Sequence, residues 1–153
     1  MNPTADRAEA VFREGFNCSQ SVLSCCGERF GLDRQTAFRM GEAFGGGMGR
    51  MGLTCGAVTG AFMAIGLKHA KLTPDDQSSR EKSIHLVRRF RQAFEARHGS
   101  ISCKELLDCD ISTPEGYQQA VDRRLFREVC PKLVRDAAEI IEQLLWTNED
   151  MAP

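Results

Sequence analysis

The sequence has almost no net charge. Its 20 lysines and arginines nearly balance 21 aspartates and glutamates, which gives a formal net charge of -1. Proteins that bind nucleic acid or anionic membrane surfaces generally carry an excess of positive charge. We therefore expect neither a nucleic acid partner nor a membrane partner.

The sequence also lacks an export signal and a long apolar run. Its first twenty residues contain no basic segment followed by an apolar one. The most apolar stretch, residues 57–67, is far shorter than the roughly 20 residues that cross a bilayer. These absences predict a cytoplasmic protein in which residues 57–67 form a buried helix.

No C-x-x-C pair occurs, although the chain has 7 cysteines. Such pairs are typical of zinc ribbons and of many thiol exchange sites. Cytoplasmic cysteines are kept reduced, and their odd number also argues against a framework of structural disulfides. Any site that several thiols share must therefore be assembled by the fold.

Apolar residues recur with the spacing of amphipathic helices, and no segment alternates as a strand. This pattern predicts an all-α fold, a compact helical bundle of about six to eight helices in a single domain over residues 1–153. The expected helices lie near residues 4–14, 18–30, 34–44, 55–70, 74–98, 103–108 and 115–146, with a break in the last at Pro131. Two Thr-Pro pairs predict capped helix starts and two glycines predict helix ends: Thr73-Pro74, Thr113-Pro114, Gly31 and Gly99.

Five glycines are concentrated in residues 45–52. They predict an irregular loop with several positive φ angles. Its last six residues match G-x-G-x-x-G, but a dinucleotide site needs a preceding strand, and here a helix is expected. In the next helix Gly56, Gly60 and Ala64 share one face, which predicts close packing against a neighbouring backbone.

Four cysteines fall where a helix is expected to begin. They are Cys18 after the cap Asn17, Cys55 after the cap Thr54, Cys103 in a Ser102–Glu105 capping box, and Cys130, itself the expected cap before Pro131. A helix start presents unpaired N–H groups and the positive end of the helix dipole, which stabilise a thiolate over a thiol. These four are our candidate catalytic and metal-ligating residues, and the alternative is that they are ordinary small buried residues.

The other three cysteines have less favourable settings. Cys26 lies on the apolar stripe of its helix and is expected in the core. Cys25 is too far along the same helix to pair directly with Cys18. Cys109 lies between two aspartates, which disfavour a thiolate. We leave these three outside the site.

The candidate cysteines belong to four sequence blocks. These are Asn17-Cys18-Ser19-Gln20, the glycine-rich run into Cys55-Gly56-Ala57-Val58-Thr59-Gly60, Gly99-Ser100-Ile101-Ser102-Cys103, and Cys130-Pro131. In this order they resemble the C-GCAxxG-C-C family of redox-active proteins, over nearly the whole chain. The resemblance implies a helical domain with a redox role carried by Cys18, Cys55, Cys103 and Cys130. A similar domain is associated with split-Soret cytochromes and with a two-iron two-sulfur cluster, but this chain has no C-x-x-C-H haem attachment sequence.

Two redox hypotheses use the four thiols. One is thiol–disulfide exchange, and the other is an iron-sulfur centre that passes electrons to an unidentified redox partner. The alternatives are a non-catalytic zinc or copper binding module and a helical interaction protein with incidental cysteines.

Other residues outside these motifs also suggest roles. Arg50, in the glycine loop, is a candidate partner for a thiolate or an anionic substrate, with a solvated arginine as the alternative. His98 lies near a helix C-terminus, where a structural role is expected. Leu144, Leu145 and Trp146 exceed what one core requires, which predicts a homodimer surface.

Overall fold

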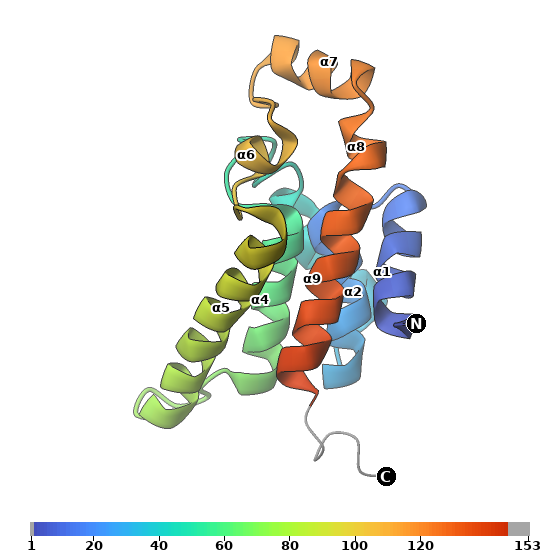
Figure 1. Ribbon diagram of the computed structural model, residues 1–153. Helices are drawn as coiled ribbons and strands as arrows, with labels where there is room; N and C mark the ends of the chain where they lie inside the picture. Colours follow the sequence, from blue (N-terminus) through green and yellow to red (C-terminus); the bar gives the residue numbers. More distant parts are fainter. Residues whose placement is uncertain (1, 147–153) are drawn as a thin grey trace.

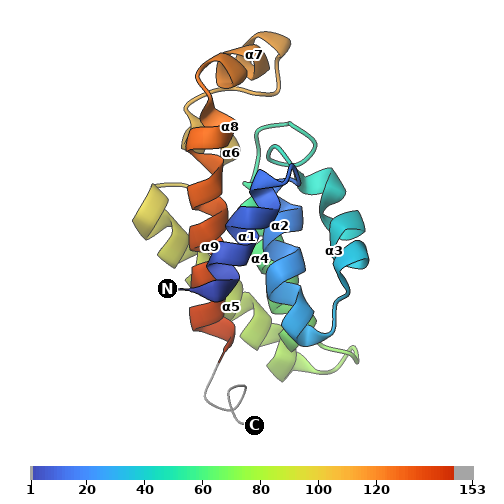
Figure 2. The same ribbon diagram turned by 90° about the vertical axis from the view of Figure 1, so that its right-hand side faces the viewer.

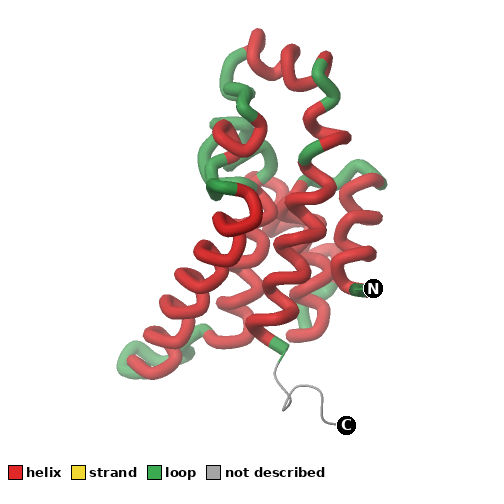
Figure 3. The backbone as a smooth tube through the Cα atoms, in the orientation of Figure 1, coloured by secondary structure: helices red, strands yellow, loops and turns green. Residues whose placement is uncertain are grey.

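The computed structural model describes residues 2–146 and has an all-α fold, as the sequence predicts (Figure 1). The helices are α1 (Pro3–Arg13), α2 (Cys18–Gly27), α3 (Arg34–Gly41), α4 (Gly56–His69), α5 (Gln77–His98), α6 (Cys103–Leu107), α7 (Pro114–Asp122), α8 (Leu125–Glu128) and α9 (Cys130–Leu145), with short 3-10 helices η1 (Glu28–Phe30) and η2 (Glu42–Phe44). Within residues 2–146 no strand forms, and the helices are joined by loops (Figure 3). No helix in this range is long and apolar enough to cross a membrane.

The main core lies between α1, α2, α4, α5 and α9 (Figures 1 and 2). Helix α4 runs through its centre and is apolar on nearly every face, so that Val58, Ala61 and Ile65 are completely buried. This confirms a buried helix over most of residues 57–67, although Leu67 at its end is exposed. The amphipathic helix α9 covers it with Ile140 and Ile141.

A second, smaller cluster lies where α6, α7 and α8 stand at one end of the bundle (Figure 1). Leu107, Ile111, Ala120 and Leu125 form it together with three cysteines. Because it meets the main core at the starts of α2, α4 and α9, this end of the molecule is where the two apolar clusters adjoin.

Several predicted helix ends are confirmed. Gly31 and Gly99 have φ angles of 85° and 83°, in the left-handed region where glycine is favoured. Thr113 caps α7, and its Oγ1 accepts a hydrogen bond from the Gly116 N–H at 3.0 Å. The Thr73-Pro74 prediction is wrong, because α5 begins three residues later under the cap Asp76.

The predicted break at Pro131 is also misplaced. The backbone turns at Arg124, which has a φ of 58°, and again at Val129. Pro131 instead stands in the first turn of α9, where a helix does not use the missing N–H.

The apolar residues at the C-terminal end of α9 are largely taken up by the main core. Leu145 is completely buried, and Leu144 packs against the main core. Trp146 does so as well, and the Arg29 guanidinium lies 4.0 Å from the centre of its ring. A homodimer through these residues stays a prediction, with Leu144 and Trp146 partly exposed.

Candidate functional site: four thiols around one cavity

The start of α2 is held by a capping box. The Asn17 Oδ1 accepts from the Gln20 N–H, and the Gln20 Oε1 accepts from the Asn17 N–H, each at 2.9 Å. The Asn17 Nδ2 also donates to the carbonyls of Gly41 and Glu42 at the end of α3. These bonds confirm the predicted cap and place Cys18 as the first residue of α2.

The glycine loop forms a left-handed turn. Residues 46–50 all have positive φ angles, between 58° and 67°. Gly47 has no room for a side chain, because an added Cβ would lie 2.6 Å from the Cβ of Cys103. The Gly47 carbonyl accepts from the Leu53 N–H at 2.9 Å, and the Leu53 carbonyl accepts from the Cys103 N–H at 2.6 Å. The loop therefore connects directly to the start of α6.

Backbone hydrogen bonds also join the segment before Cys55 to the segment before Cys103. Thr54 forms an isolated bridge with Ser102, and the Cys55 N–H donates to the Ile101 carbonyl at 2.8 Å. Cys55 and Cys103, which are distant in sequence, thereby begin their helices next to one another.

Small residues let α4 approach α2 closely, as predicted. A Cβ on Gly56 would lie 3.0 Å from the Ser19 nitrogen and 3.1 Å from the Cys18 Cβ, and one on Gly60 would lie 2.8 Å from the Ser19 oxygen. Because both glycines lack a side chain, the starts of the two helices, and with them Cys18 and Cys55, come together.

Three details of the predicted helix starts need correction. Cys55 is itself the N-cap of α4, because Thr54 is engaged in the bridge. The capping box around Cys103 does not form, since the Ser102 side chain makes no cap bond and Glu105 accepts from the Ser100 hydroxyl instead. Cys130 is the first residue of α9 and Val129 is its cap.

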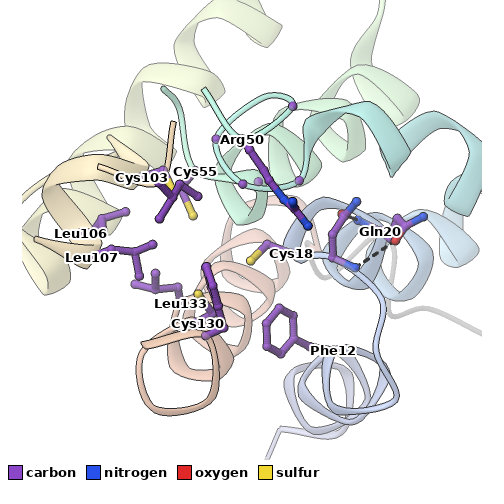
Figure 4. Close-up of a pocket in the computed structure, with 18 of the residues that line it drawn as sticks. Phe12, Cys18, Gln20, Arg50, Cys55, Cys103, Leu106, Leu107, Cys130 and Leu133 are labelled. Carbon is purple, nitrogen blue, oxygen red and sulfur yellow. Dashed lines mark hydrogen bonds between the residues drawn. The ribbon is translucent and has the colours of Figure 1, made fainter. Parts of the chain in front are cut away.

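Cys18, Cys55, Cys103 and Cys130 line one cavity of about 640 Å³ (Figure 4). Its wall also contains the apolar side chains of Phe12, Leu106, Leu107 and Leu133, and the glycine loop. All four cysteines are free thiols. Cys18 is partly exposed, and the other three are buried.

The cysteines of the cavity shift one another's pKa values. The pKa of Cys18 is raised, first by its hydrogen bonds to Cys130 and Cys55 and then by burial, so Cys18 holds its proton. The pKa of Cys55 is lowered, because the Cys18 thiol donates to its sulfur and because the N–H groups of Ala57 and Val58 at the helix start stabilise its thiolate. These effects outweigh the opposing effect of burial.

Cys103 behaves in the opposite way. Burial, together with the nearby sulfurs of Cys55 and Cys130, raises its pKa to about 12. The expectation that a helix start favours the thiolate is therefore right for Cys55 and wrong for Cys18 and Cys103. At Cys103 the first N–H of the helix is already bonded to Leu53.

The remaining cysteines lie away from the cavity wall. Cys26 is completely buried in the main core, and Cys25 lies at a smaller hollow beside Arg7 and Arg34. The Cys109 thiol is buried and donates to the Gly116 carbonyl at 3.0 Å.

Among residues 2–146, no group of three or more His, Cys, Asp or Glu side chains is arranged to hold a metal ion. The four thiols therefore share a cavity without the arrangement of a tetrahedral zinc or copper site.

The cavity also contains residues that sequence reasoning missed. Tyr117 lines it and lies under the Arg50 guanidinium, which is 4.3 Å from the ring centre. Phe12 contributes from α1. Nothing in the local sequence of either residue indicates this role, because their neighbours in the cavity come from other helices.

Fold and cavity define an all-helical protein with four free cysteines around one hollow. A family model described as "Putative redox-active protein (C_GCAxxG_C_C)" matches residues 16–144, and the chain belongs to this family. No curated protein and no solved structure matches the chain.

Proposed function

We propose that the protein carries out thiol–disulfide exchange through Cys55 and Cys18. The observation that carries this proposal is that Cys18 and Cys55, at the closely packed starts of α2 and α4, line the same cavity. Their mutual influence supports it, because the pKa of Cys55 is lowered while that of Cys18 is raised. A thiolate beside a thiol that can resolve it is the arrangement that exchange requires.

The reaction proceeds in two displacements. The Cys55 thiolate attacks one sulfur of a substrate disulfide, whose S–S bond breaks, and a mixed disulfide and one substrate thiolate form. Cys55 then no longer accepts the Cys18 proton, so Cys18 ionises more readily and attacks the Cys55 sulfur. The second substrate thiolate leaves and takes up the Cys18 proton. Two electrons pass from the cysteine pair to the substrate, and a Cys18–Cys55 disulfide remains.

The test is to treat the reduced protein, purified without oxygen, with a small disulfide and to map its products by mass spectrometry. We expect a Cys18–Cys55 disulfide, and a trapped mixed disulfide on Cys55 in C18A. C55S should abolish the reaction, whereas C25A, a cysteine outside the cavity, should leave it unchanged. Reaction confined to Cys25 or Cys109 would overturn the proposal.

A second candidate is a two-iron two-sulfur centre held by Cys18, Cys55, Cys103 and Cys130. It is favoured by one specific observation: all four thiols face the same cavity, while exchange needs only two of them. Such a cluster would supply one-electron transfer, and the four thiolates would hold it.

Absorption spectroscopy with iron and sulfide analysis of anaerobically purified protein separates the two candidates. Visible bands with iron and sulfide support the cluster. A colourless protein that reacts with disulfides supports exchange. Bound zinc without colour would favour a structural metal module, and unreactive, metal-free thiols would favour incidental cysteines in an interaction protein.

A further inference from the structure

Arg50 is the one basic residue among the described residues that line the cavity. Its side chain reaches from the glycine loop into the hollow, and in Figure 4 its guanidinium end points toward Cys18 and Gln20. Arg50 itself is exposed, so it lies at the accessible side of the cavity rather than in the core.

The Arg50 guanidinium is held in place without an acidic partner. One face stacks on the Tyr117 ring, with 4.3 Å from Cζ to the ring centre. Within residues 2–146 no carboxylate lies at ion-pair distance from it. Stacking uses the face of the planar group and leaves its N–H edge for a ligand, which is how arginine recognises carboxylates.

Glu42 is the one acid among the described wall residues, and it is already engaged. Its Oε2 accepts a hydrogen bond from the Gln20 Nε2 at 2.7 Å. Gln20 in turn belongs to the capping box of α2, so Glu42 is directed toward the end of that helix. The charge that Arg50 presents to the cavity is therefore not neutralised by a direct contact.

The glycine loop adds further donors. Gly46, Gly47 and Gly49 line the cavity, and their N–H groups donate to no other described residue. Gly47 is moreover buried, where an N–H without a partner is unfavourable.

We propose that the substrate is a low-molecular-weight disulfide bearing a carboxylate, which Arg50 and the glycine loop bind while Cys55 attacks the disulfide. This inference rests on the exchange function proposed above. The attraction between Arg50 and the carboxylate offsets the repulsion between the carboxylate and the Cys55 thiolate. Arg50 therefore determines substrate specificity without taking part in the bonds that form or break. The bonds that form and break are those of the two displacements already described, with the substrate released as one thiol and one thiolate.

The experiment measures second-order rates of Cys18–Cys55 oxidation with three linear disulfides of similar size. Dithiodipropionate is anionic, bis(2-hydroxyethyl) disulfide is neutral, and cystamine is cationic. We expect dithiodipropionate to react fastest. In R50Q its rate should fall by about fivefold or more, the rate of the neutral reagent should not change, and R50K should retain most of the preference.

A matched control removes the same charge elsewhere. Arg39 is an exposed arginine on α3 that is not among the residues lining the cavity, and R39Q should leave all three rates unchanged. An equal loss in R39Q would mean that net charge, not the cavity, selects the reagent, and would overturn the inference.

The outcomes distinguish this inference from the function on which it rests. If all three reagents oxidise Cys18 and Cys55 at rates that R50Q leaves unchanged, exchange stands and the anionic substrate is refuted. If cystamine reacts fastest, Glu42 dominates the cavity and the inference is likewise refuted. If none of the reagents oxidises these two cysteines, the exchange function itself fails.

Discussion

Alkylation should rank the cavity cysteines by their thiolate content. In the reduced, metal-free protein, Cys55 is expected to react with iodoacetamide at a lower pH than Cys103 or Cys26. The Cys55 pKa lies below the ordinary value of 9.0, whereas burial raises the pKa of Cys103 to about 12 and raises that of Cys26 even further.

The size of the difference follows from these pKa values. With its pKa lowered, Cys55 holds a much larger thiolate fraction near pH 8 than Cys103, whose pKa is raised to about 12. The more basic Cys103 thiolate is, however, the better nucleophile. This cancels about half, on a logarithmic scale, of the rate advantage that Cys55 gains from its larger thiolate fraction. Cys55 should therefore react about tenfold faster or more than Cys103. Cys26 should be slower still, because it is completely buried and needs local opening of the core.

A pair of variants isolates the contribution of Cys18. C18A removes the thiol that donates to Cys55. Because a hydrogen bond to a charged group is worth about 1.5–3 kcal/mol, the Cys55 pKa should rise by about one to two units. C18S keeps a hydroxyl donor at the same place, so its effect should be smaller.

The assay is brief labelling across a pH series, followed by mass spectrometry of the cysteine peptides. If Cys103 or Cys26 is labelled as early as Cys55, the reasoning from the helix start and the Cys18 hydrogen bond is refuted. Equal profiles for C18A and the unmodified protein would leave the helix start as the source of the low Cys55 pKa.

Three further predictions concern the scaffold. G47A should destabilise the protein by about 1–3 kcal/mol more than G99A in urea unfolding, because both have positive φ but only at Gly47 would the new methyl lie within 2.6 Å of another side chain. N17A should reduce the free energy of unfolding by about 1 kcal/mol through loss of the α2 cap, and an unchanged unfolding midpoint would contradict that role. Burial lowers the His98 pKa despite Asp136 at 2.9 Å, so the unfolded chain binds a proton more readily and stability should fall as the pH drops below about 6.5; in H98Q the difference in Tm between pH 7.5 and pH 5.5 should shrink.

Helix positions were largely readable from the sequence because their signals are local. Apolar spacing, the Asn17–Gln20 capping box and glycines at helix ends each act within a few residues. The misplaced boundaries arose where a competing local choice existed. Asp76 capped α5 in place of Thr73, and Pro131 fitted the first turn of α9 instead of ending a helix.

The four candidate cysteines could be identified from the sequence, but the direction of their pKa shifts could not. A helix start predicts a stabilised thiolate from backbone geometry alone. Whether that effect prevails depends on burial and on the sulfurs brought from other helices, and these lower the pKa of Cys55 but raise those of Cys18 and Cys103.

By itself, then, the sequence determined the all-α class, most helix boundaries, and which four cysteines stand at helix starts, since all of these depend on interactions between near neighbours in the chain. The tertiary structure alone decided that the four thiols share one cavity, that Cys18 donates to Cys55, and that Arg50 stacks on Tyr117. The physical reason is that each of these contacts joins residues from different helices, and the distance between them is set by how closely the glycine-lined backbones pack.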